Sequence, residues 1–399
     1  MNRTLPVLLV SLLVLAVATS CTNAPPPAGA PAPPAAAAPN EIRIGVNAEL
    51  TGSIPVVGES CKNAAEFAVK EVMDAGGLEV GGKKIPVVIS VDDNENKAES
   101  AAAVAQKLSS TGELAMIGPN ASGNAIPAAE VAESSHLPMI SPWSTNPKLT
   151  RDARSGEPRK YVFRACFTDD VQGAVDAKFA LSELHTAKPA VLYDVASEYN
   201  KGIAEVYKQT MESAGVKVVA FETYTKGDKD FSAQLTSIVH SGADSLFLPN
   251  YYSEIPLQVK QARQLGYQGK ILGSDSWGDE ELIKLAGTAC EGLFFTNHYA
   301  PDMATPTAQK FIKAYQAAYG KVPNDVAALT YDSFELLFSA IKAARKVDRE
   351  AVRTALGAIT SYEGVTGTMQ FKGTGDPVKS FVIVQIKDGK FKFYQTAKP

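Results

Sequence analysis

The stretch Pro189–Thr223 reads PAVLYDVASEYNKGIAEVYKQTMESAGVKVVAFET and contains the pattern that decides the fold. The continuous apolar run at Pro189–Asp194 predicts a strand buried on both faces. Apolar residues at helical spacing follow over 200–213, and Val216–Thr223 predicts the next strand. A strand, a helix and another strand in succession are typical of a parallel α/β sheet covered by helices.

The same alternation extends in both directions along the chain. Further strands are expected from Ile42 onward and at 85–91, 115–118, 138–141, 245–249, 270–273 and 291–297. Further helices are expected at 64–73, 97–108, 127–135, 171–184, 230–241, 254–265, 306–319 and 325–345. A last hairpin, 381–394, should turn at Asp388-Gly389, which is a typical two-residue turn. The two halves therefore share one architecture.

Length and composition exclude several classes of protein. A chain of 399 residues and about 42 kDa predicts two domains. With 45% apolar residues, disorder cannot dominate, because so much apolar surface would collapse. The net charge of −4, without a basic block, argues against nucleic-acid binding. The four His and four Cys are scattered, so we expect no metal and no cofactor.

The first 40 residues carry targeting signals rather than fold. Arg3 and an apolar run shorter than a membrane span predict a signal peptide over residues 1–20. Cys21 follows Ala18-Thr19-Ser20, as in a lipobox, so lipidation at Cys21 is expected. The alternative is an ordinary secretory signal that contains a cysteine. Residues 21–40 then form the lipid anchor and a Pro/Ala linker, which would act as an extended spacer.

Polar residues gather where the predicted strands end. Ligands bind beyond the carboxyl ends of strands in open parallel sheets. The segments that follow five strands are 118–124, 141–147, 193–199, 249–252 and 273–277. Hydroxyls and free amides at helix N-termini suit an anion, and the Asp275 carboxylate suits an ammonium group. Together they would bind an α-amino-acid zwitterion, although each loop alone could hold mere helix caps and packing residues.

These loops, taken together, resemble those of a known family. The segments that carry the resemblance are Leu50-Thr51-Gly52, Asp92-Asp93, Ile117-Gly118-Pro119, Ser141–Pro147, Phe163-Arg164 with Gln172-Gly173, and Gly273-Ser274-Asp275. They are similar to the leucine/isoleucine/valine-binding proteins, the type I periplasmic substrate-binding proteins of branched-chain-type amino-acid ABC transporters. The resemblance covers nearly all of residues 41–399.

The resemblance implies an α/β fold of two doubly wound, Rossmann-like lobes joined by a three-segment hinge. The N-terminal lobe would comprise residues 41–165 plus 298–370. The C-terminal lobe would comprise residues 166–297 plus 371–399. We expect the chain to cross between the lobes near 165–168, 296–299 and 369–373.

The resemblance also implies roles for particular residues. Ser122 and Thr145 match the carboxylate-binding positions, and Asp275 matches the acidic residue that meets the ammonium group. Two further ligand-binding positions are Trp143, whose main chain should contribute, and its neighbour Ser144. Two aromatic positions on the closing lobe are matched by Tyr199 and Tyr251.

Several departures from the family concern the side-chain pocket and the cysteines. Relatives have an aromatic residue at Val57, a small one at Trp143 and an apolar one at Asn120. The head-group site is thus retained while the side-chain pocket differs, so leucine specificity does not carry over. Trp143 could narrow the pocket for a small ligand, or stack on a flat or cationic one. The family disulfide partners are absent. Cys61 with Cys166 is a candidate pair, and unpaired buried cysteines, Cys290 included, are the alternative.

The resemblance implies a periplasmic, lipid-anchored, monomeric receptor that captures a small solute, foremost an amino acid. Hinge closure would trap the solute, and membrane subunits of an ABC permease would receive it. Enzyme motifs such as Gly-x-Gly-x-x-Gly and His-Glu-x-x-His are absent, so we expect no enzyme. The alternatives are a ligand-sensing adaptor for a signalling partner, a binder of an amide, urea or aromatic or organic acid, and an enzyme on a doubly wound fold.

Overall fold

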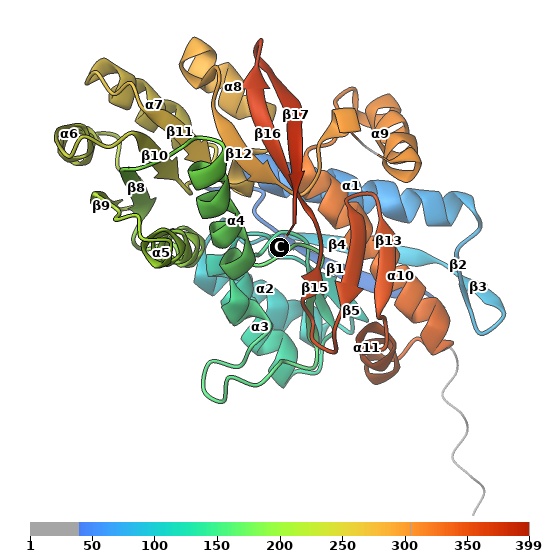
Figure 1. Ribbon diagram of the computed structural model, residues 1–399. Coiled ribbons are helices and arrows are strands. Elements are labelled where there is room, and N and C mark those ends of the chain that lie inside the picture. The colour runs from blue at the N-terminus through green and yellow to red at the C-terminus, as the bar shows by residue number, and fades with distance from the viewer. Residues whose placement is uncertain (1–39, 304, 399) are drawn as a thin grey trace, which may run out of the picture. The chain divides into compact units, whose positions relative to one another are not determined.

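The computed structural model describes residues 40–303 and 305–398 (Figure 1). The predicted signal peptide, the lipidation of Cys21 and the linker up to Pro39 lie outside these residues. In the ranges that are described, no helix combines the length and the apolar character needed to cross a membrane.

The first lobe is built on a five-stranded parallel sheet in the order β4-β1-β5-β6-β7. Its strands are β1 (Ile42–Ala48), β4 (Val87–Asp93), β5 (Ala115–Ile117), β6 (Met139–Ser141) and β7 (Val162–Arg164). The connecting helices are α1 (Pro55–Asp74), α2 (Ala98–Ser110), α3 (Ser122–Ser134) and the short η1 (Pro147–Leu149). The winding direction reverses between β1 and β5, and the carboxyl ends of such a pair of strands are where ligands bind in open sheets.

The second lobe repeats this winding. Its sheet has the order β17-β16-β12-β11-β10-β8-β9. The parallel strands are β8 (Pro189–Asp194), β9 (Ala220–Tyr224), β10 (Ser245–Leu248), β11 (Lys270–Gly273) and β12 (Phe294–Asn297). The antiparallel hairpin β16 (Phe381–Lys387) and β17 (Lys390–Ala397) completes the sheet. Its helices are α4 (Asp169–Ser182), α5 (Glu198–Ser213), η2 (Asp275–Trp277), α6 (Ser232–His240), α7 (Ile255–Gln264), α8 (Glu280–Ala286) and η3 (Gly287–Cys290).

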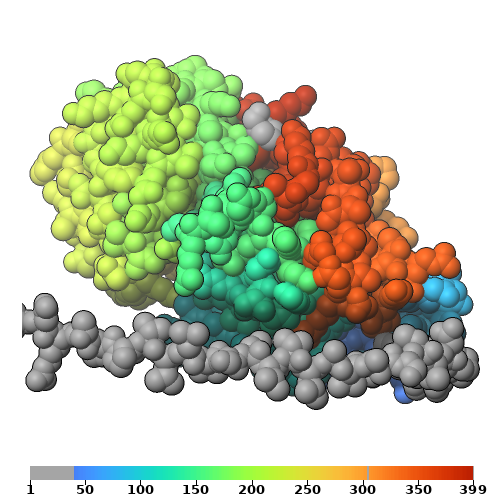
Figure 2. All heavy atoms as spheres, turned by 90° about the horizontal axis from the view of Figure 1, so that it is seen from below, coloured from blue at the N-terminus to red at the C-terminus, as the bar shows by residue number. Residues whose placement is uncertain are grey.

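After the second sheet the chain returns to the first lobe. The returning elements are η4 (Pro301–Met303), α9 (Pro306–Tyr319), α10 (Asp325–Ala344), α11 (Arg349–Gly357), β13 (Ser361–Gly364), β14 (Gly367–Phe371) and β15 (Pro377–Val378). Helix α10 packs on α1. It also contacts a small hairpin that consists of β2 (Leu78–Val80) and β3 (Lys83–Ile85). Figure 2 shows the orange returning segment beside the teal residues of the first lobe, with the yellow-green residues of the second lobe on the other side of the teal ones.

The predicted fold class is confirmed, because two parallel α/β sheets with the same strand order are present. The strand pattern explains why the sequence signal was strong. All six residues of β8 are buried, as expected for a strand covered on both faces. Helix α1 ends before Gly76-Gly77, whose positive φ values of 89° and 104° a residue with a side chain rarely adopts.

The chain passes between the two sheets three times. These passages are the loops Ala165–Thr168, His298–Ala300 and Lys379–Ser380, which connect elements of one sheet with elements of the other. The third follows the strand β15, where Pro377 pairs with Phe371 of β14. The lobe bounds and crossing points expected from the resemblance stay predictions.

A stack of rings joins the three passages. The Phe167 ring lies between the rings of His298 and Phe381, with centroid distances of 3.8 Å and 3.9 Å. Lys379 Nζ donates a hydrogen bond to Ala165 O at 3.2 Å. The three hinge segments are therefore packed directly against one another.

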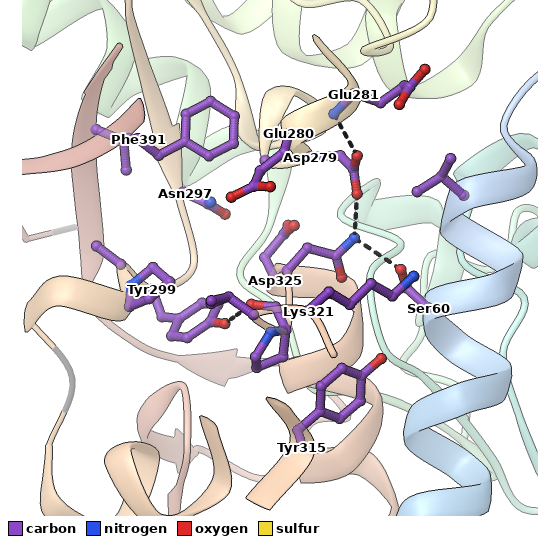
Figure 3. A pocket seen from close by; sticks show the side chains of 18 of the residues that line it. Ser60, Asp279, Glu280, Glu281, Asn297, Tyr299, Tyr315, Lys321, Asp325 and Phe391 are labelled. Atoms are coloured by element: carbon purple, nitrogen blue, oxygen red, sulfur yellow. Dashed lines mark hydrogen bonds between the residues drawn. The ribbon is translucent and has the colours of Figure 1, made fainter. Parts of the chain in front are cut away.

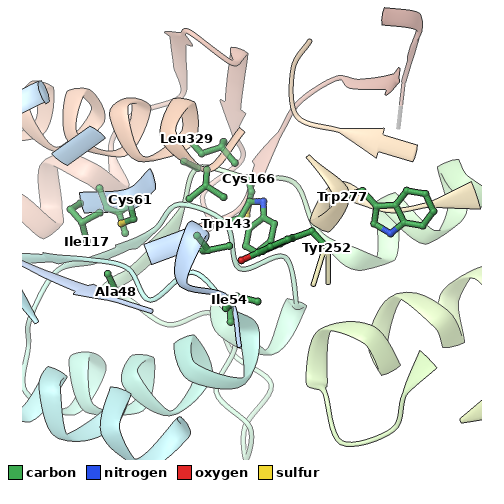
Figure 4. Close-up of a cluster of buried hydrophobic side chains, with 14 of the residues drawn as sticks. Ala48, Ile54, Cys61, Ile117, Trp143, Cys166, Tyr252, Trp277 and Leu329 are labelled. Carbon is green, nitrogen blue, oxygen red and sulfur yellow. The ribbon is translucent and has the colours of Figure 1, made fainter. Parts of the chain in front are cut away.

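The three cysteines in the described part of the chain are buried thiols without disulfides. The candidate pair Cys61 and Cys166 is not bonded, and the alternative of unpaired buried cysteines holds. Both side chains belong to the main buried apolar cluster (Figure 4). Burial raises the pKa of Cys61 to about 11 and that of Cys166 to about 12, so both remain protonated at neutral pH.

Candidate ligand-binding site

A narrow cavity, too tight in this conformation to hold a water molecule, lies where the carboxyl ends of the two sheets face each other. Its lining consists of Asn120, Ser122, Trp143, Tyr199, Tyr251 and Asp275. Five of the seven residues predicted to bind ligand thus line one cavity. The other two, Ser144 and Thr145, are buried beside Trp143 in the same loop.

The first lobe presents hydroxyls and backbone amides. Ser122 is the first residue of α3, which starts five residues earlier than predicted, so its amide and that of Gly123 have no intrahelical partner. Ser122 Oγ accepts hydrogen bonds from Ser144 Oγ at 3.1 Å and from the Asn146 amide at 3.4 Å. This surface suits a carboxylate, because helix N-termini carry unpaired donors and partial positive charge.

A buried arginine fixes the loop that contains Ser144 and Thr145. The Arg164 guanidinium donates to Ser144 O at 2.7 Å and to Asn146 O at 2.9 Å. Thr145 O accepts from the Asp169 amide at 2.9 Å, and among the described residues the buried Thr145 Oγ1 has no hydrogen-bond partner. The loop is therefore held through its carbonyls, which leaves the threonine hydroxyl available.

Glu49 is a site residue that sequence reasoning missed. It follows β1 directly, is fully buried, and its Oε1 accepts hydrogen bonds from the amides of Asn120 at 3.1 Å and Ala121 at 3.0 Å. Its other oxygen accepts from Asn120 Nδ2 at 2.9 Å, while Asn120 Oδ1 has no partner among the described residues. An acidic residue directly after the first buried strand was the available signal.

Asp275 is the main acceptor of the second lobe. It begins η2 after β11, and only 1% of its surface is exposed. Its Oδ1 accepts hydrogen bonds from Tyr199 Oη at 2.5 Å and Gln172 Nε2 at 3.0 Å. Its Oδ2 lies 3.1 Å from His298 Nε2. Gln172 and His298 were not predicted as site residues, although His298 directly follows β12 and the rule for strand ends could have indicated it.

The Asp275 charge is not neutralised by its histidine neighbour. Burial lowers the pKa of His298 to about 4, against the opposing effect of Asp275, so the imidazole is neutral at pH 7. No Lys or Arg lines the cavity. A buried carboxylate that lacks a cationic partner attracts an ammonium group strongly.

Three aromatic side chains from the two lobes complete the lining. Trp143 lies 6.1 Å from Tyr251, and Tyr251 lies 5.5 Å from Tyr199, measured between ring centroids. Trp143 Nε1 donates to Asp325 Oδ2 at 2.7 Å. Asp325 is a second missed residue, which lies 182 positions away from its partner. These rings exclude water and can contact a cation.

Among the described residues, no group of three or more His, Cys, Asp or Glu is arranged to hold a metal ion. The site is instead a cavity between two lobes, with hydroxyls and amides on one side and a carboxylate on the other. This arrangement defines a two-lobed solute-binding protein.

Comparison with known proteins identifies the family. Residues 41–390 match the family model described as periplasmic binding protein, and the chain belongs to this family. A Leu/Ile/Val-binding protein homolog of Brucella melitensis is 32% identical over 360 residues, covering 89% of this chain and 94% of that protein. The leucine-, isoleucine-, valine-, threonine-, and alanine-binding protein of Pseudomonas aeruginosa is 31% identical, covering 86% and 89%.

A solved structure agrees with this assignment. The leucine binding protein LivK of Thermotoga maritima has a TM-score of 0.83 at 34% identity, covering 90% of this chain and 99% of that one. The relatives are solute-binding proteins rather than enzymes.

Proposed function

We propose that this protein is an extracytoplasmic lipoprotein that captures a small α-amino acid by hinge closure and delivers it to an ABC permease. The observation that carries the proposal is the buried Asp275 carboxylate, which faces the hydroxyls and amides at the start of α3 across one small cavity. It acts as a receptor and not as an enzyme. Cys21 would carry the lipid that holds it in the cell envelope.

The charges of the site match the two ends of an amino acid. The ammonium group would lie against Asp275, with the rings of Trp143, Tyr199 and Tyr251 around it. The carboxylate would lie against Ser122 and Thr145, at the N-terminus of α3. Because the two groups of the ligand are bound by different lobes, the ligand favours the closed state.

The Trp143 indole limits the side chain of the ligand. It lines the cavity, is buried, and is held in place by its hydrogen bond to Asp325 Oδ2 at 2.7 Å. The ligand we propose is therefore an amino acid with a small side chain, which fits the narrowing expected from Trp143.

Substitution of Asp275 tests the proposal. Asp275→Asn keeps the shape of the side chain and removes its charge, and Asp275→Ala removes both. We expect either variant to weaken amino-acid binding by about 2–5 kcal/mol, roughly 30- to 5000-fold, because a buried charge pair is broken. Isothermal titration calorimetry with alanine, glycine and serine measures the effect.

Glu280→Gln is the matched control for this experiment. Glu280 lies five residues further along the same segment but outside the small cavity, so its variant should bind like the unmodified protein. A thermal-shift panel of amino acids and organic acids identifies the solute, because a bound ligand raises the melting temperature by mass action. Unchanged affinity in both Asp275 variants would show that the zwitterion model is wrong.

One structural observation favours an amide or urea as the second candidate. Asn120 Oδ1 and Thr145 Oγ1 are buried without partners among the described residues, and either could accept a hydrogen bond from an N–H group. An uncharged amide should keep most of its affinity in Asp275→Asn, whereas an amino acid should not. A carboxylic acid without an amine is disfavoured by Asp275.

An adaptor for a signalling partner would bind its ligand at the same site. It would differ from a transport receptor only in its protein partner.

A further inference from the structure

A second, larger cavity lies beside the ligand site. It has a volume of about 250 Å³ and lies between the start of α1 and residues 321–325 on one lobe and the start of α8 and the end of β12 on the other (Figure 3). Its lining includes six acidic side chains, Glu59, Asp279, Glu280, Glu281, Asp302 and Asp325, and two lysines, Lys284 and Lys321. Acidic side chains therefore outnumber basic ones in this lining, although Asp325 is itself held protonated by burial, which raises its pKa to about 8.

One hydrogen-bonded pair separates the two cavities. Trp143 lines the small cavity, Asp325 lines the large one, and Trp143 Nε1 donates to Asp325 Oδ2 at 2.7 Å. Both side chains are buried, with 5% and 2% of their surface exposed. A Cβ atom on Gly278 would lie only 2.5 Å from Asp325 Oδ1, so this carboxyl reaches the backbone of the opposite lobe. The indole and the carboxyl group therefore meet directly between the two cavities.

Most of the carboxylates in the large cavity already have partners. The partnered ones are Glu59 with Lys321, Glu281 with Lys284, Asp279 with the Glu281 amide and Asn324, and Asp302 with the Phe393 amide. Glu280 has no ion pair or hydrogen bond to the described residues, and its carboxylate points into the cavity in Figure 3. Glu280 is therefore the carboxylate that is free to meet a cation.

An unpartnered buried hydroxyl also points to a ligand in this space. Tyr315 has no exposed surface, lines the large cavity, and its Oη has no hydrogen-bond partner among the described residues (Figure 3). Burying such a hydroxyl without a partner costs about 1–3 kcal/mol. A polar ligand group or water in the cavity would remove that cost.

We propose that Trp143 and Asp325 form a partition that restricts the ligand to a short side chain, and that the cavity behind them is a subsite for a cationic chain end. This inference rests on the proposed function, because the main chain of the ligand would still bind at Asp275 and Ser122. Replacing the indole joins the two cavities. A side chain that carries an ammonium group could then reach Glu280 and Asp325.

Three ligands of different length and charge test the partition. Alanine has a short side chain, norleucine has a long apolar one, and lysine has a long cationic one. In calorimetry, the unmodified protein should bind alanine at least tenfold more tightly than either long ligand. Trp143→Ala should improve lysine binding at least tenfold and norleucine binding by less. Trp143→Leu, which keeps more apolar bulk, should show the same order and covers the case in which the alanine variant does not fold.

Removing the Glu280 charge distinguishes two causes of a gain in lysine affinity: attraction of the ammonium group to Glu280, and the space freed by the Trp143 substitution. In the Trp143→Ala background, Glu280→Gln should reduce lysine affinity at least threefold and leave norleucine affinity unchanged. Equal gains for lysine and norleucine would overturn the cationic subsite, and tight lysine binding by the unmodified protein would overturn the partition. If the unmodified protein binds alanine but neither Trp143 variant gains a long ligand, this inference alone fails. If no amino acid binds any form, the proposed function fails.

Discussion

The ionisation of Asp325 couples the site to the stability of the fold. Burial raises its pKa to about 8, and the nearby charges of Asp275 and Asp279 act in the same direction. The hydrogen bond from Trp143 opposes this shift. The carboxyl is therefore mostly protonated at pH 7, while in the unfolded chain it ionises near pH 3.8.

The sign of the resulting pH dependence follows from proton binding. Between pH 3.8 and 8 the folded state holds a proton on Asp325 that the unfolded state has lost. The stabilising contribution is thus complete below pH 3.8 and is lost as the pH rises through 8. One proton corresponds to a slope of about 1.4 kcal/mol per pH unit.

Asp325→Asn should remove this slope, because an amide keeps the acceptor for Trp143 but does not titrate. Urea unfolding of the unliganded protein at several pH values from 5 to 8 measures it. We expect the free energy of unfolding of the unmodified protein, relative to that of the variant, to fall by up to about 1.4 kcal/mol per pH unit. A difference that stays constant with pH would contradict a raised Asp325 pKa.

Which site residues the sequence could predict depended on their local context. Ser122, Trp143 and Asp275 directly follow apolar strands, so the rule for carboxyl ends of parallel strands indicated all three. His298 directly follows the parallel strand β12, so the same rule could have indicated it. Asp325 follows no strand, and it enters the site only because the returning chain brings it to Trp143, 182 residues away.

At the scale of elements, apolar runs next to Pro or Gly were predicted accurately, whatever their length. Strands β8 and β11 have the predicted bounds, since each is such a run. The start of α1 was predicted nine residues late, at Ala64 rather than Pro55. The start of α3 was placed late, because Ser122-Gly123-Asn124 is typical of a loop and Pro127 of a helix start. The two-residue strand β15 is defined only by its pairing with β14, which local patterns cannot show.

The ring stack at the hinge predicts a large cost for one core substitution. Phe167 is buried between His298 and Phe381, and it belongs to the first passage between the lobes. Phe167→Ala should lower the free energy of unfolding by about 3–5 kcal/mol, through lost burial and a cavity. Phe167→Leu keeps most of the volume and should cost less than about 1.5 kcal/mol. Guanidinium unfolding compares the two, and equal costs would argue against packing as the cause.

At the scale of the whole molecule, a few polar contacts join the lobes around the site. Asn146 Nδ2 donates to Glu198 O at 2.8 Å, and Lys148 Nζ lies 2.7 Å from Glu198 Oε2. On another face, the Val56 amide donates to Tyr252 Oη at 3.4 Å. In the proposed mechanism these contacts exist only in the closed state, so they add to the affinity for ligand without contacting it.

The ion pair between Lys148 and Glu198 offers the sharpest test of closure. Glu198→Gln removes the charge but leaves the backbone bond from Asn146 intact. Both side chains are exposed, so the pair should contribute about 0.2–1 kcal/mol. If the unliganded protein is mainly open, that energy appears in binding, and the Kd should rise by about 1.4- to 5-fold.

The control for this variant is an ion pair that lies within one lobe. Lys201 and Glu205 are similarly exposed on α5, four residues apart, and Lys201→Gln should leave the Kd unchanged. Glu198→Gln should not alter the unfolding midpoint of the unliganded protein, and at high salt its effect on binding should fade, because salt screens exposed charges. An equal loss of stability with and without ligand would mean that the lobes are already closed before binding. In that case ligand affinity could not arise from hinge closure, and the receptor would bind its solute as a preformed pocket.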